Sequence, residues 1–123
     1  MGLLILASAS TARQSLLRGA GIPFEVDASH VRELKGRGRT LRATVLENAR
    51  RKARSVARRR PGRAVLAADT MIEFEGRLVG KPATRRAAFE LMARMAGRPH
   101  TLATGVVLVR GGRTLARVVE TVV

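Results

Sequence analysis

The sequence predicts an α/β fold in which helices flank a mixed sheet. Two short apolar runs, "LLILA" (3–7) and "AVLAA" (64–68), are typical of buried strands. Three further segments repeat apolar residues at helical spacing between capping residues. Near the end of the chain, two strand-like segments flank a Gly-Gly pair, which is a hairpin pattern. At 123 residues, these elements fit a single domain, residues 1–123.

The first strand leads through "SASTAR" (8–13) into a helix of about ten residues. Ser10 is a suitable N-cap, and Gly21 ends the helix. Its apolar stripe consists of Ala12, Leu16, Leu17 and Ala20. The next segment, "PFEVDAS" (23–29), predicts a short strand, and "ELKGRGRT" (33–40) predicts a mobile loop.

A long helix is expected from the Thr40 cap to about Arg60, where "PG" ends it. One face is apolar and comprises Leu41, Val45, Ala49, Ala53, Val56 and Ala57. The opposite face carries Arg50, Arg51, Arg54 and Arg58. Lys52 falls on the inward side, between Val45 and Val56. Two interpretations stay open: a lysine that snorkels from the edge of the stripe, or an ammonium group delivered into a cleft.

The second buried strand is expected to end at Asp69, and "MIEFEGRLVG" (71–80) predicts a hairpin around Glu75 and Gly76. Thr84 can cap a third helix that ends at Gly97. Its apolar face comprises Ala87, Ala88, Leu91, Met92 and Met95. The last hairpin pairs "HTLATGVVLVR" (100–110) with "RTLARVVETVV" (113–123). Because the sequence stops within an apolar strand, we expect the domain to be truncated at its C-terminus.

The net charge of +15 comes from 24 basic and 9 acidic residues and raises the question of nucleic-acid binding. Three Phe and no Tyr or Trp leave almost no surface on which bases could stack, which argues against single-stranded nucleic acid. A solvated basic surface is the simpler interpretation. No segment is long enough to span a bilayer and no basic region precedes the first apolar run, so we expect a cytoplasmic protein without a membrane partner.

Lysine is rare in this arginine-rich chain. Only Lys35, Lys52 and Lys81 are lysines among the 24 basic residues. A position that keeps lysine can require a compact ammonium whose pKa can be tuned. The "GKP" segment around Lys81 is not a P-loop, because Gly76 and Gly80 enclose three residues instead of four and proline follows the lysine.

Asp69 is the central candidate for chemistry, because ligands of open α/β sheets bind at the carboxyl ends of strands. A turn residue is the alternative. Ser8, Ser10 and Arg13 come where the first strand enters a helix N-terminus, a place suited to an anion. Glu33 lies in the loop that could fold over such a site.

Several short motifs follow one another in the order known from one protein family. They are "LILASAS…R", "GIPFEV", "NARRKA", "AADT", "GKP", "GRPHTLATGV" and "ETVV". Over essentially its whole length the chain resembles the Maf-like (septum-formation-type) nucleoside triphosphate pyrophosphatases. The resemblance implies a Maf/ITPase-like mixed sheet with a cleft between two lobes. It also implies hydrolysis of a nucleoside triphosphate to a monophosphate and pyrophosphate with Mg²⁺ or Mn²⁺. "ADT" and "GRPHTLATG" resemble the branch that acts on dTTP and UTP, not the branch that acts on 7-methyl-GTP.

The resemblance also assigns roles to residues. Ser8 and Arg13 match the family's phosphate-contacting loop, and Glu33 matches the last acidic residue of its acidic loop. Asp69 would act as general base or as a ligand of the metal ion, aided by Glu33. The cations that would neutralise the triphosphate and the leaving pyrophosphate are Arg13, Lys52 and Lys81.

The sequence departs from the family pattern at several places. Thr11 and Ala12 replace a proline and an arginine of the N-terminal loop, and His30 and Arg32 stand where acidic residues are usual. The family's glutamine-glycine segment and closing elements have no counterpart. Two other functions therefore stay open: a remnant that only binds nucleotides through Lys52, Lys81 and Arg13, and a basic nucleic-acid-binding module. A nucleoside triphosphate is the expected partner, and a homodimer is an open alternative for the assembly.

Overall fold

A computed structural model describes residues 2–123 and shows a mixed six-stranded sheet with strand order β2-β1-β3-β5-β6 and β4 paired with β3. The strands are β1 (Leu4–Leu6), β2 (Phe24–Val26), β3 (Val65–Phe74), β4 (Arg77–Val79), β5 (Thr101–Arg110) and β6 (Arg113–Val122). The helices are α1 (Thr11–Gly19), α2 (Leu41–Arg59) and α3 (Arg85–Met95). β1 pairs in parallel with β2 and β3, and the other pairs are antiparallel, so the predicted α/β class with a mixed sheet is confirmed.

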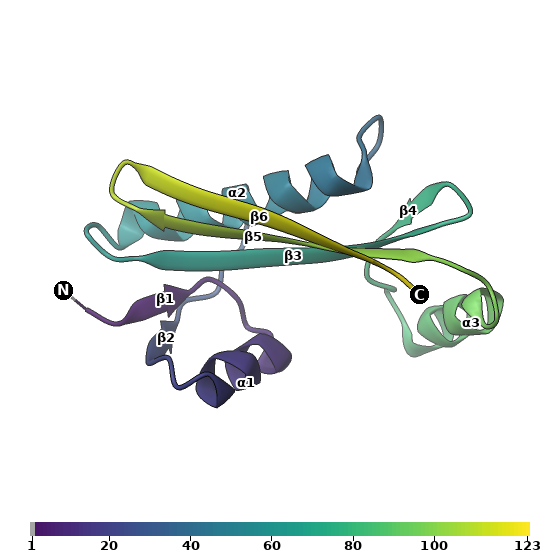
Figure 1. Cartoon of the computed structure of the whole chain (residues 1–123), viewed down its shortest axis with the longest axis horizontal. Helices are drawn as coiled ribbons and strands as arrows, with labels where there is room; N and C mark the ends of the chain where they lie inside the picture. Colours follow the sequence, from purple (N-terminus) through teal and green to yellow (C-terminus); the bar gives the residue numbers. More distant parts are fainter. Residues whose placement is uncertain (1) are drawn as a thin grey trace.

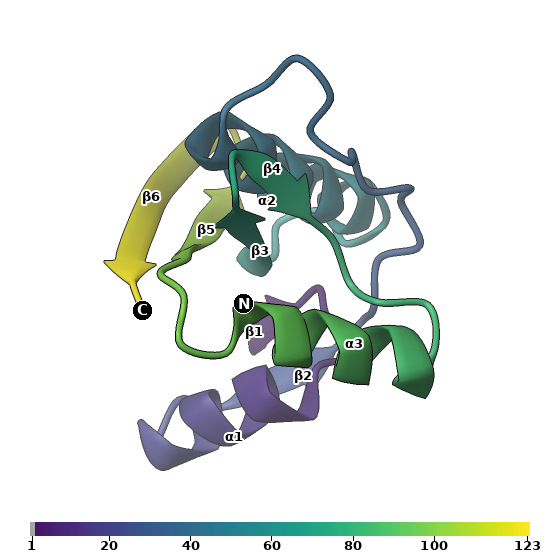
Figure 2. The same ribbon diagram turned by 90° about the vertical axis from the view of Figure 1, so that its right-hand side faces the viewer.

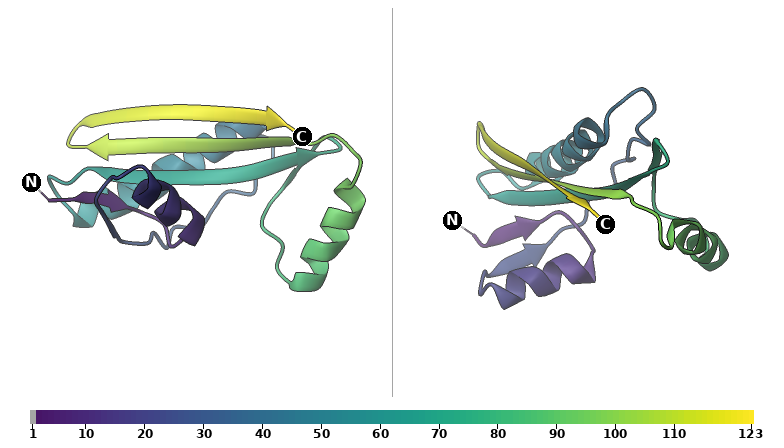
Figure 3. Two further views of the ribbon diagram at one scale, coloured as in Figure 1. Left: turned by 60° about the horizontal axis from the view of Figure 1, so that its bottom comes forward. Right: turned by 45° about the vertical axis from the view of Figure 1, so that its right-hand side comes forward.

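The helices lie on opposite sides of the sheet. α2 runs along the long strands β3, β5 and β6 on one side (Figure 1). Seen from the end, α1 and α3 lie on the other side (Figure 2). These two helices are separate, with α1 beside β1 and β2 and α3 near the far end of the long strands (Figure 3). Among residues 2–123, no helix combines the length and the apolar character that crossing a membrane requires.

Each helix begins as its capping residue predicts. The hydroxyl oxygens of Ser10, Thr40 and Thr84 accept hydrogen bonds from the backbone N–H three residues later, at 3.3, 3.1 and 3.0 Å. Such a bond satisfies one of the N–H groups that a helix start leaves without an intrahelical partner. The three predicted helices and both predicted hairpins are therefore present.

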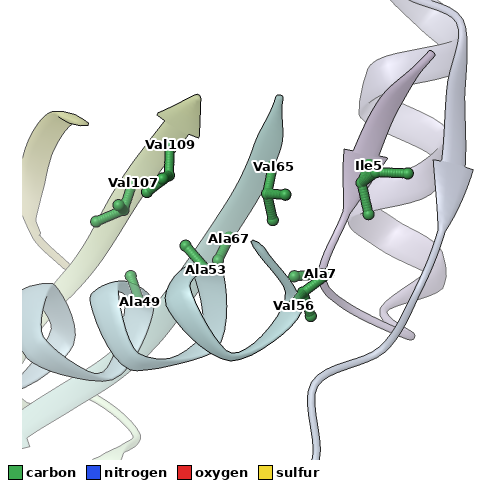
Figure 4. Close-up of a cluster of buried hydrophobic side chains, with 9 residues drawn as sticks. All are labelled: Ile5, Ala7, Ala49, Ala53, Val56, Val65, Ala67, Val107 and Val109. Atoms are coloured by element: carbon green, nitrogen blue, oxygen red, sulfur yellow. The ribbon is translucent and has the colours of Figure 1, made fainter. Parts of the chain in front are cut away.

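The core lies between α2 and the sheet (Figure 4). Five of the six predicted apolar positions of α2 are buried: Leu41, Val45, Ala49, Ala53 and Val56. Ala49, Ala53 and Val56 pack against alternate residues of the strands, Val65 and Ala67 on β3 and Val107 and Val109 on β5. Ala57 is half-buried at the edge of this cluster. Leu41 and Val45 form a second cluster with Met71 and Ala103. Burial of these side chains is the main favourable contribution that holds α2 to the sheet.

The apolar stripes of α1 and α3 are much less covered than that of α2. Neither helix contains a buried residue. Leu16 of α1 is 73% exposed, and Met92 of α3 is 71% exposed. The expected helical faces exist in the sequence, but within residues 2–123 no element packs over them closely enough to bury them.

One predicted boundary is wrong. β3 does not end at Asp69 but continues without a break to Phe74, because its pairing with β5 runs from Val65↔Val109 to Glu73↔Thr101. The ladder places Asp69 opposite Gly105 and gives this segment regular backbone partners, so no turn forms at Asp69. Asp69 therefore lies within a long strand, beyond the point where its short neighbour β1 ends at Leu6.

Gly105 allows α2 to approach the sheet beside Asp69. A Cβ atom at this position would lie 2.6 Å from the backbone oxygen of Val45, a distance that real Cβ atoms do not show. Glycine is therefore required by packing here and not by an unusual backbone dihedral angle. The closeness of α2 at this point brings its side chains within reach of β3.

A group of arginine–carboxylate pairs ties the N-terminal strands to the end of α2. Arg59 contacts Asp27 through two hydrogen bonds, of 2.7 and 3.2 Å, and Arg60 lies 3.2 Å from the same carboxylate. Glu25 pairs with Arg60 and Arg63. The hydrogen bond from Arg59, together with the charges of Arg59 and Arg60, holds the pKa of the Asp27 carboxyl below its ordinary value.

Replacing Gly105 by alanine should lower the free energy of unfolding by about 1–3 kcal/mol, because the added methyl group would push α2 away from the sheet. Urea denaturation followed by circular dichroism would measure the change. Gly112→Ala is the matched control, since a Cβ at Gly112 would meet no atom within 4 Å. It should change the stability by less than about 0.5 kcal/mol. Equal midpoints for the two variants would show that α2 does not depend on this close approach.

Asp27→Asn should lower the stability at neutral pH and have no effect in acid. Because the pKa of the folded carboxyl is lowered, its contribution is present above the ordinary value of 3.8 and is lost as pH falls through the lowered folded value. Urea midpoints of the two proteins should therefore differ at pH 7 and converge below about pH 3. Glu90→Gln, which removes an exposed helical ion pair to Arg86, is the control and should show no comparable difference. A difference that persisted in acid would mean that the ionised carboxylate is not the stabilising group.

Candidate functional site

A gap in the sheet marks the candidate site. On one side β3 pairs with β5 almost along its whole length, but on the other side β1 reaches only to Leu66 and β4 begins to pair at Ile72. Residues 67–71 of β3 thus have no strand partner on this side within residues 2–123. We call this stretch of open strand edge the notch. It is bounded by the carboxyl ends of two strands, β1 and β4, whose chains both run toward it.

Asp69 lies in the middle of the notch and is held by two side chains of α2. Asn48 Nδ2 donates a hydrogen bond of 2.9 Å to Asp69 Oδ2, and Lys52 Nζ donates one of 3.2 Å to Oδ1. The aspartate is only 4% exposed and Asn48 is 1% exposed. Both carboxylate oxygens therefore have a fixed donor, which keeps the group oriented and compensates its burial.

Lys52 joins Asp69 to the loop between β2 and α2. Its ammonium lies 2.6 Å from Glu33 Oε1 and also donates to the backbone oxygen of Ala68 at 3.3 Å. The Lys52 side chain is 13% exposed, whereas that of Glu33 is 54% exposed. The ammonium is thus placed inside the molecule between two carboxylates, and not at the solvent edge as a snorkelling lysine would be.

The loop from Ala28 to Arg39 packs along α2 through a second stripe of that helix. Thr44, Asn48 and Lys52 follow one another at intervals of four and so share one side of α2. Asn48 accepts a hydrogen bond from the Leu34 N–H at 2.7 Å and donates one to the Leu34 carbonyl at 3.1 Å. Gly36, with a φ of +86°, sits so close to Thr44 and Leu78 that a Cβ would lie 3.1 and 2.2 Å from their side chains.

Ser8 and Arg13 belong to a second group of polar side chains. Arg13 Nη1 donates to Ser8 Oγ at 3.3 Å, and Nη2 donates to Thr70 Oγ1 at 3.4 Å. Thr70 is also bonded to Thr104 through their hydroxyl groups at 2.8 Å. Because successive residues of a strand point to opposite faces, this group and Asp69 lie on the two faces of β3 at the notch.

Lys81 lies near the notch but is not joined to the other candidate residues. It is exposed and follows β4, whose antiparallel pairing carries the chain from Val79, opposite Ile72, toward the middle of β3. Within residues 2–123 its ammonium has no hydrogen bond and no ion pair. The structure thus brings Glu33, Lys52 and Asp69 together, and Ser8 with Arg13, but leaves Lys81 on the rim.

The carboxylates of Glu33 and Asp69 are suited to binding one cation together with phosphate and water, and not to enclosing a metal ion with protein ligands alone. Among residues 2–123, no cluster of three or more His, Cys, Asp or Glu side chains could hold a metal ion. Glu33 and Asp69 do converge, since both contact the same ammonium. Magnesium is commonly bound by one or two protein carboxylates together with phosphate oxygens and water. The two oxygen donors present here fit that mode of binding.

The outer face of α2 is less positive than its arginines suggest. Glu47 pairs with Arg51 at 3.1 Å and with Arg50 at 3.5 Å. Burial raises the pKa of Glu47, but the hydrogen bonds and charges of the two arginines outweigh it and the net pKa is lowered. The carboxylate therefore stays ionised at neutral pH and offsets part of the basic charge of this face.

Sequence reasoning missed Asn48, Thr70 and Thr104. Asn48 carried a usable signal, because Thr44, Asn48 and Lys52 repeat at intervals of four next to the apolar stripe, and a polar side chain on an inward face needs a partner. The threonines gave no such signal. They face each other only because β3 and β5 pair in a register that sets Thr70 against Thr104.

The fold is similar to that of solved structures. A HAM1 protein from Coxiella burnetii matches with a TM-score of 0.63 at 17% identity, covering 99% of this chain and 72% of that one. The Staphylococcus aureus Ham1 protein matches with a TM-score of 0.63 at 15% identity, covering 97% and 69% of the two chains. At such low identity the likeness concerns the fold alone, and it confirms the expected Maf/ITPase-like architecture.

Curated relatives are more similar in sequence. The chain is 47% identical over 120 residues to a dTTP/UTP pyrophosphatase of Symbiobacterium thermophilum and 46% identical over 111 residues to one of Thermomicrobium roseum. A dTTP/UTP pyrophosphatase of Bacillus anthracis is 37% identical over 112 residues. The alignments cover 98%, 89% and 91% of this chain but 62%, 51% and 59% of the relatives, so the chain spans between half and two thirds of their length.

The profile of one family accounts for nearly the whole chain. The match to the family described as "Maf-like protein" runs from residue 3 to residue 123. It includes the notch, the residues that hold Asp69 and both hairpins. The chain therefore belongs to the Maf-like protein family.

Proposed function

We propose that this protein is a nucleoside triphosphate pyrophosphatase that hydrolyses dTTP or UTP to the monophosphate and pyrophosphate. The observation that carries the proposal is the convergence of Glu33, Lys52 and Asp69 at the open edge of β3. The names of the curated relatives support the substrate class. The proposal concerns the complete activity of relatives that are longer than this chain.

The reaction needs an activated water and a stabilised leaving group. The water oxygen forms a bond to the α-phosphorus, the bond from that phosphorus to the α,β-bridging oxygen breaks, and pyrophosphate leaves. Asp69 would accept the proton of the attacking water as general base. A carboxylate offers about four lone-pair positions, so the bonds from Asn48 and Lys52 leave positions free for the water.

Three cations around the notch would neutralise the phosphates. Lys52 lies beside Asp69, Arg13 lies across the strand, and Lys81 has no partner within the described chain and is free to bind an anion. Ser8 holds the Arg13 guanidinium and sits just before the N-terminus of α1, which favours a phosphate there. We expect the triphosphate to cross the notch between these groups.

A divalent cation belongs to the proposal. Glu33 and Asp69 are the residues that would hold Mg²⁺ or Mn²⁺, and the ion would supply charge compensation to the phosphate oxygens. The chain's own contribution is to bring the two carboxylates together through Lys52 and to hold Asp69 in one orientation. Glu33, which is half exposed, is the more accessible of the two donors.

We also propose that the protein works in the cytoplasm, where nucleoside triphosphates are available. A homodimer is the assembly to test, and analytical ultracentrifugation would decide it. With a net charge of +15 on each copy, a dimer should become more stable as the salt concentration rises.

The basic charge supports one second candidate, a module that binds duplex nucleic acid. Such binding would weaken steeply with salt and would be the same after Lys52→Ala or Asp69→Asn, because phosphate neutralisation by surface arginines does not involve the notch. Titration of a DNA duplex at two salt concentrations with these variants separates the two functions.

Asp69→Asn should reduce the release of pyrophosphate from dTTP or UTP by about a hundredfold or more in kcat, because the amide cannot accept the proton of the water. The measurement is a coupled pyrophosphate assay with Mg²⁺. Asp27→Asn removes the only other aspartate, which pairs with arginines at the end of α2, and should leave kcat within about threefold at a temperature where it stays folded.

Two outcomes would count against this proposal in different ways. Equal turnover by Asp69→Asn and the unchanged protein would remove Asp69 from the mechanism. Binding of dTTP or UTP by calorimetry without any turnover of the unchanged protein would instead favour a remnant that only binds nucleotides.

Lys81→Ala should lower kcat/KM by roughly tenfold to a hundredfold, because an exposed ammonium without a partner in the protein is available to the phosphates. Steady-state kinetics with UTP would measure it. Lys35→Ala is the matched control, since Lys35 is also an exposed loop lysine but has no part in the proposed phosphate site. The same loss for both lysines would show a general effect of net charge and not a contact of Lys81.

A further inference from the structure

Asn48 has an unusual set of partners for a side chain in a helix. Its amide oxygen accepts from the Leu34 N–H at 2.7 Å, and its amide nitrogen donates to the Leu34 carbonyl at 3.1 Å and to Asp69 Oδ2 at 2.9 Å. Both amide hydrogens are therefore used, each by a different segment of the chain. Exchanging the oxygen and nitrogen would set an oxygen against two acceptors, so the hydrogen-bond network fixes the orientation of the amide.

The position of Asn48 makes these bonds important. The residue is 1% exposed, so a donor or acceptor left without a partner there would lose its hydrogen bond without gaining one to water. If the loop moved away from α2, the amide would lose two of its three bonds at once. Asp69 Oδ2 would then depend on an amide that nothing else holds in place.

The loop also carries Glu33 to the site. Glu33 precedes Leu34, the residue that Asn48 clasps, and its carboxylate reaches Lys52 one helical turn further along α2. When Leu34 is hydrogen-bonded to Asn48, the Glu33 carboxylate is therefore also held beside Lys52, the residue that contacts Asp69. Lys52 also contacts both this loop and Asp69, but through a charged ammonium group. Among residues 2–123, Asn48 is the one uncharged side chain that hydrogen-bonds both.

We infer that Asn48 is a positioning residue that couples the seating of the loop 28–39 to the orientation of the Asp69 carboxylate. Asn48 touches neither the phosphates nor the water of the proposed reaction. It acts through Asp69 on one side and through Leu34 and Glu33 on the other. A ligand that draws Glu33 toward the notch would thereby also tighten the hold on Asp69.

The coupling can be measured without turnover, by hydrogen exchange of the Leu34 amide. Asn48→Ala should accelerate exchange of this amide by about tenfold or more, because its acceptor is removed. Asp69→Ala does not touch Leu34, yet it should accelerate the same amide several-fold in the presence of Asn48 and have no further effect in the Asn48→Ala background. Equal effects of Asp69→Ala in both backgrounds, or none in either, would overturn the inference.

Global destabilisation needs its own control. Ala49→Gly alters the neighbouring residue of α2, which lies in the apolar core and has no side-chain group that could hydrogen-bond Leu34 or Asp69. It should change the exchange rates of the Leu34 amide and of the core Val107 amide by the same factor. Loss of the coupling should instead change the exchange rate of the Leu34 amide alone. If Asn48→Ala does not fold, the effect of Asp69→Ala on the exchange rate of the Leu34 amide still tests the coupling, because that variant retains Asn48.

A kinetic test of the same inference rests on the proposed function. With UTP as substrate, Asn48→Ala should lower kcat by about tenfold to a hundredfold while KM changes by less than about threefold, because the carboxylate is misplaced but the cations remain. Ala49→Gly should change neither constant by more than about threefold. Absence of turnover in the unchanged protein would refute the proposed function, while the exchange experiment would still decide the role of Asn48.

Discussion

The close approach of α2 to β5 at Gly105 is the constraint on which the site depends. A helix that lies against backbone, with no side chain between, can present short polar groups to the next strand. Asn48 and Lys52 follow Val45 by about one and two turns and so arrive above Asp69, which pairs with Gly105. A buried carboxylate is stabilised only if such donors are held in place, and the apolar contacts of Ala53 and Val56 hold α2 and its donors against the sheet.

The notch arises from the different lengths of neighbouring strands. β3 and β5 are ten residues long, whereas β1 and β4 have three each, so the edge of β3 is covered at its two ends and open between them. Backbone groups of an open edge usually invite another strand. Here polar side chains surround that edge on both faces, with Asp69 on one and Thr70 on the other. The open edge of β3 between β1 and β4 is thus a place where a small polar ligand can contact side chains from both faces of the sheet.

Much of this architecture was predictable from sequence, because local signals and tertiary packing agree. The hydroxyl caps, the apolar stripe of α2 and the Gly-Gly hairpin each have a short-range physical cause. The end of β3 was not predictable in this way. Asp-Thr has a turn preference, and only its pairing with Gly105 and Thr104, more than thirty residues away, keeps the strand extended. The exposure of the apolar stripes of α1 and α3 also could not be inferred, since an apolar stripe shows which face can be covered and not what covers it.

The candidate residues show the same division between local and long-range causes. Asp69 and Lys52 could be singled out by composition and helical phase, and their contact follows from where α2 lies. Asn48 was overlooked because an asparagine beside an apolar stripe looks like an edge residue until its partners are known. The family resemblance pointed to Lys81. Its position beside the notch follows from the direction of β4, since no hydrogen bond or ion pair within residues 2–123 holds its ammonium.

The distribution of lysine and arginine follows from the geometry of their acceptors. Arginines of this chain hold structure through planar, paired contacts, as Arg59 does on Asp27. Lys52 instead contacts three separate acceptors: the carbonyl of Ala68, the carboxylate of Asp69 and that of Glu33. An ammonium carries three hydrogens on a single nitrogen and can offer one to each acceptor, whereas a guanidinium spreads its donors over a planar fork. The most exposed of these acceptors is Glu33, so an arriving phosphate would compete with Glu33 for Lys52 and leave its bond to Asp69 intact. This order of exchange would let the site bind an anion without releasing the carboxylate on which the proposed chemistry depends.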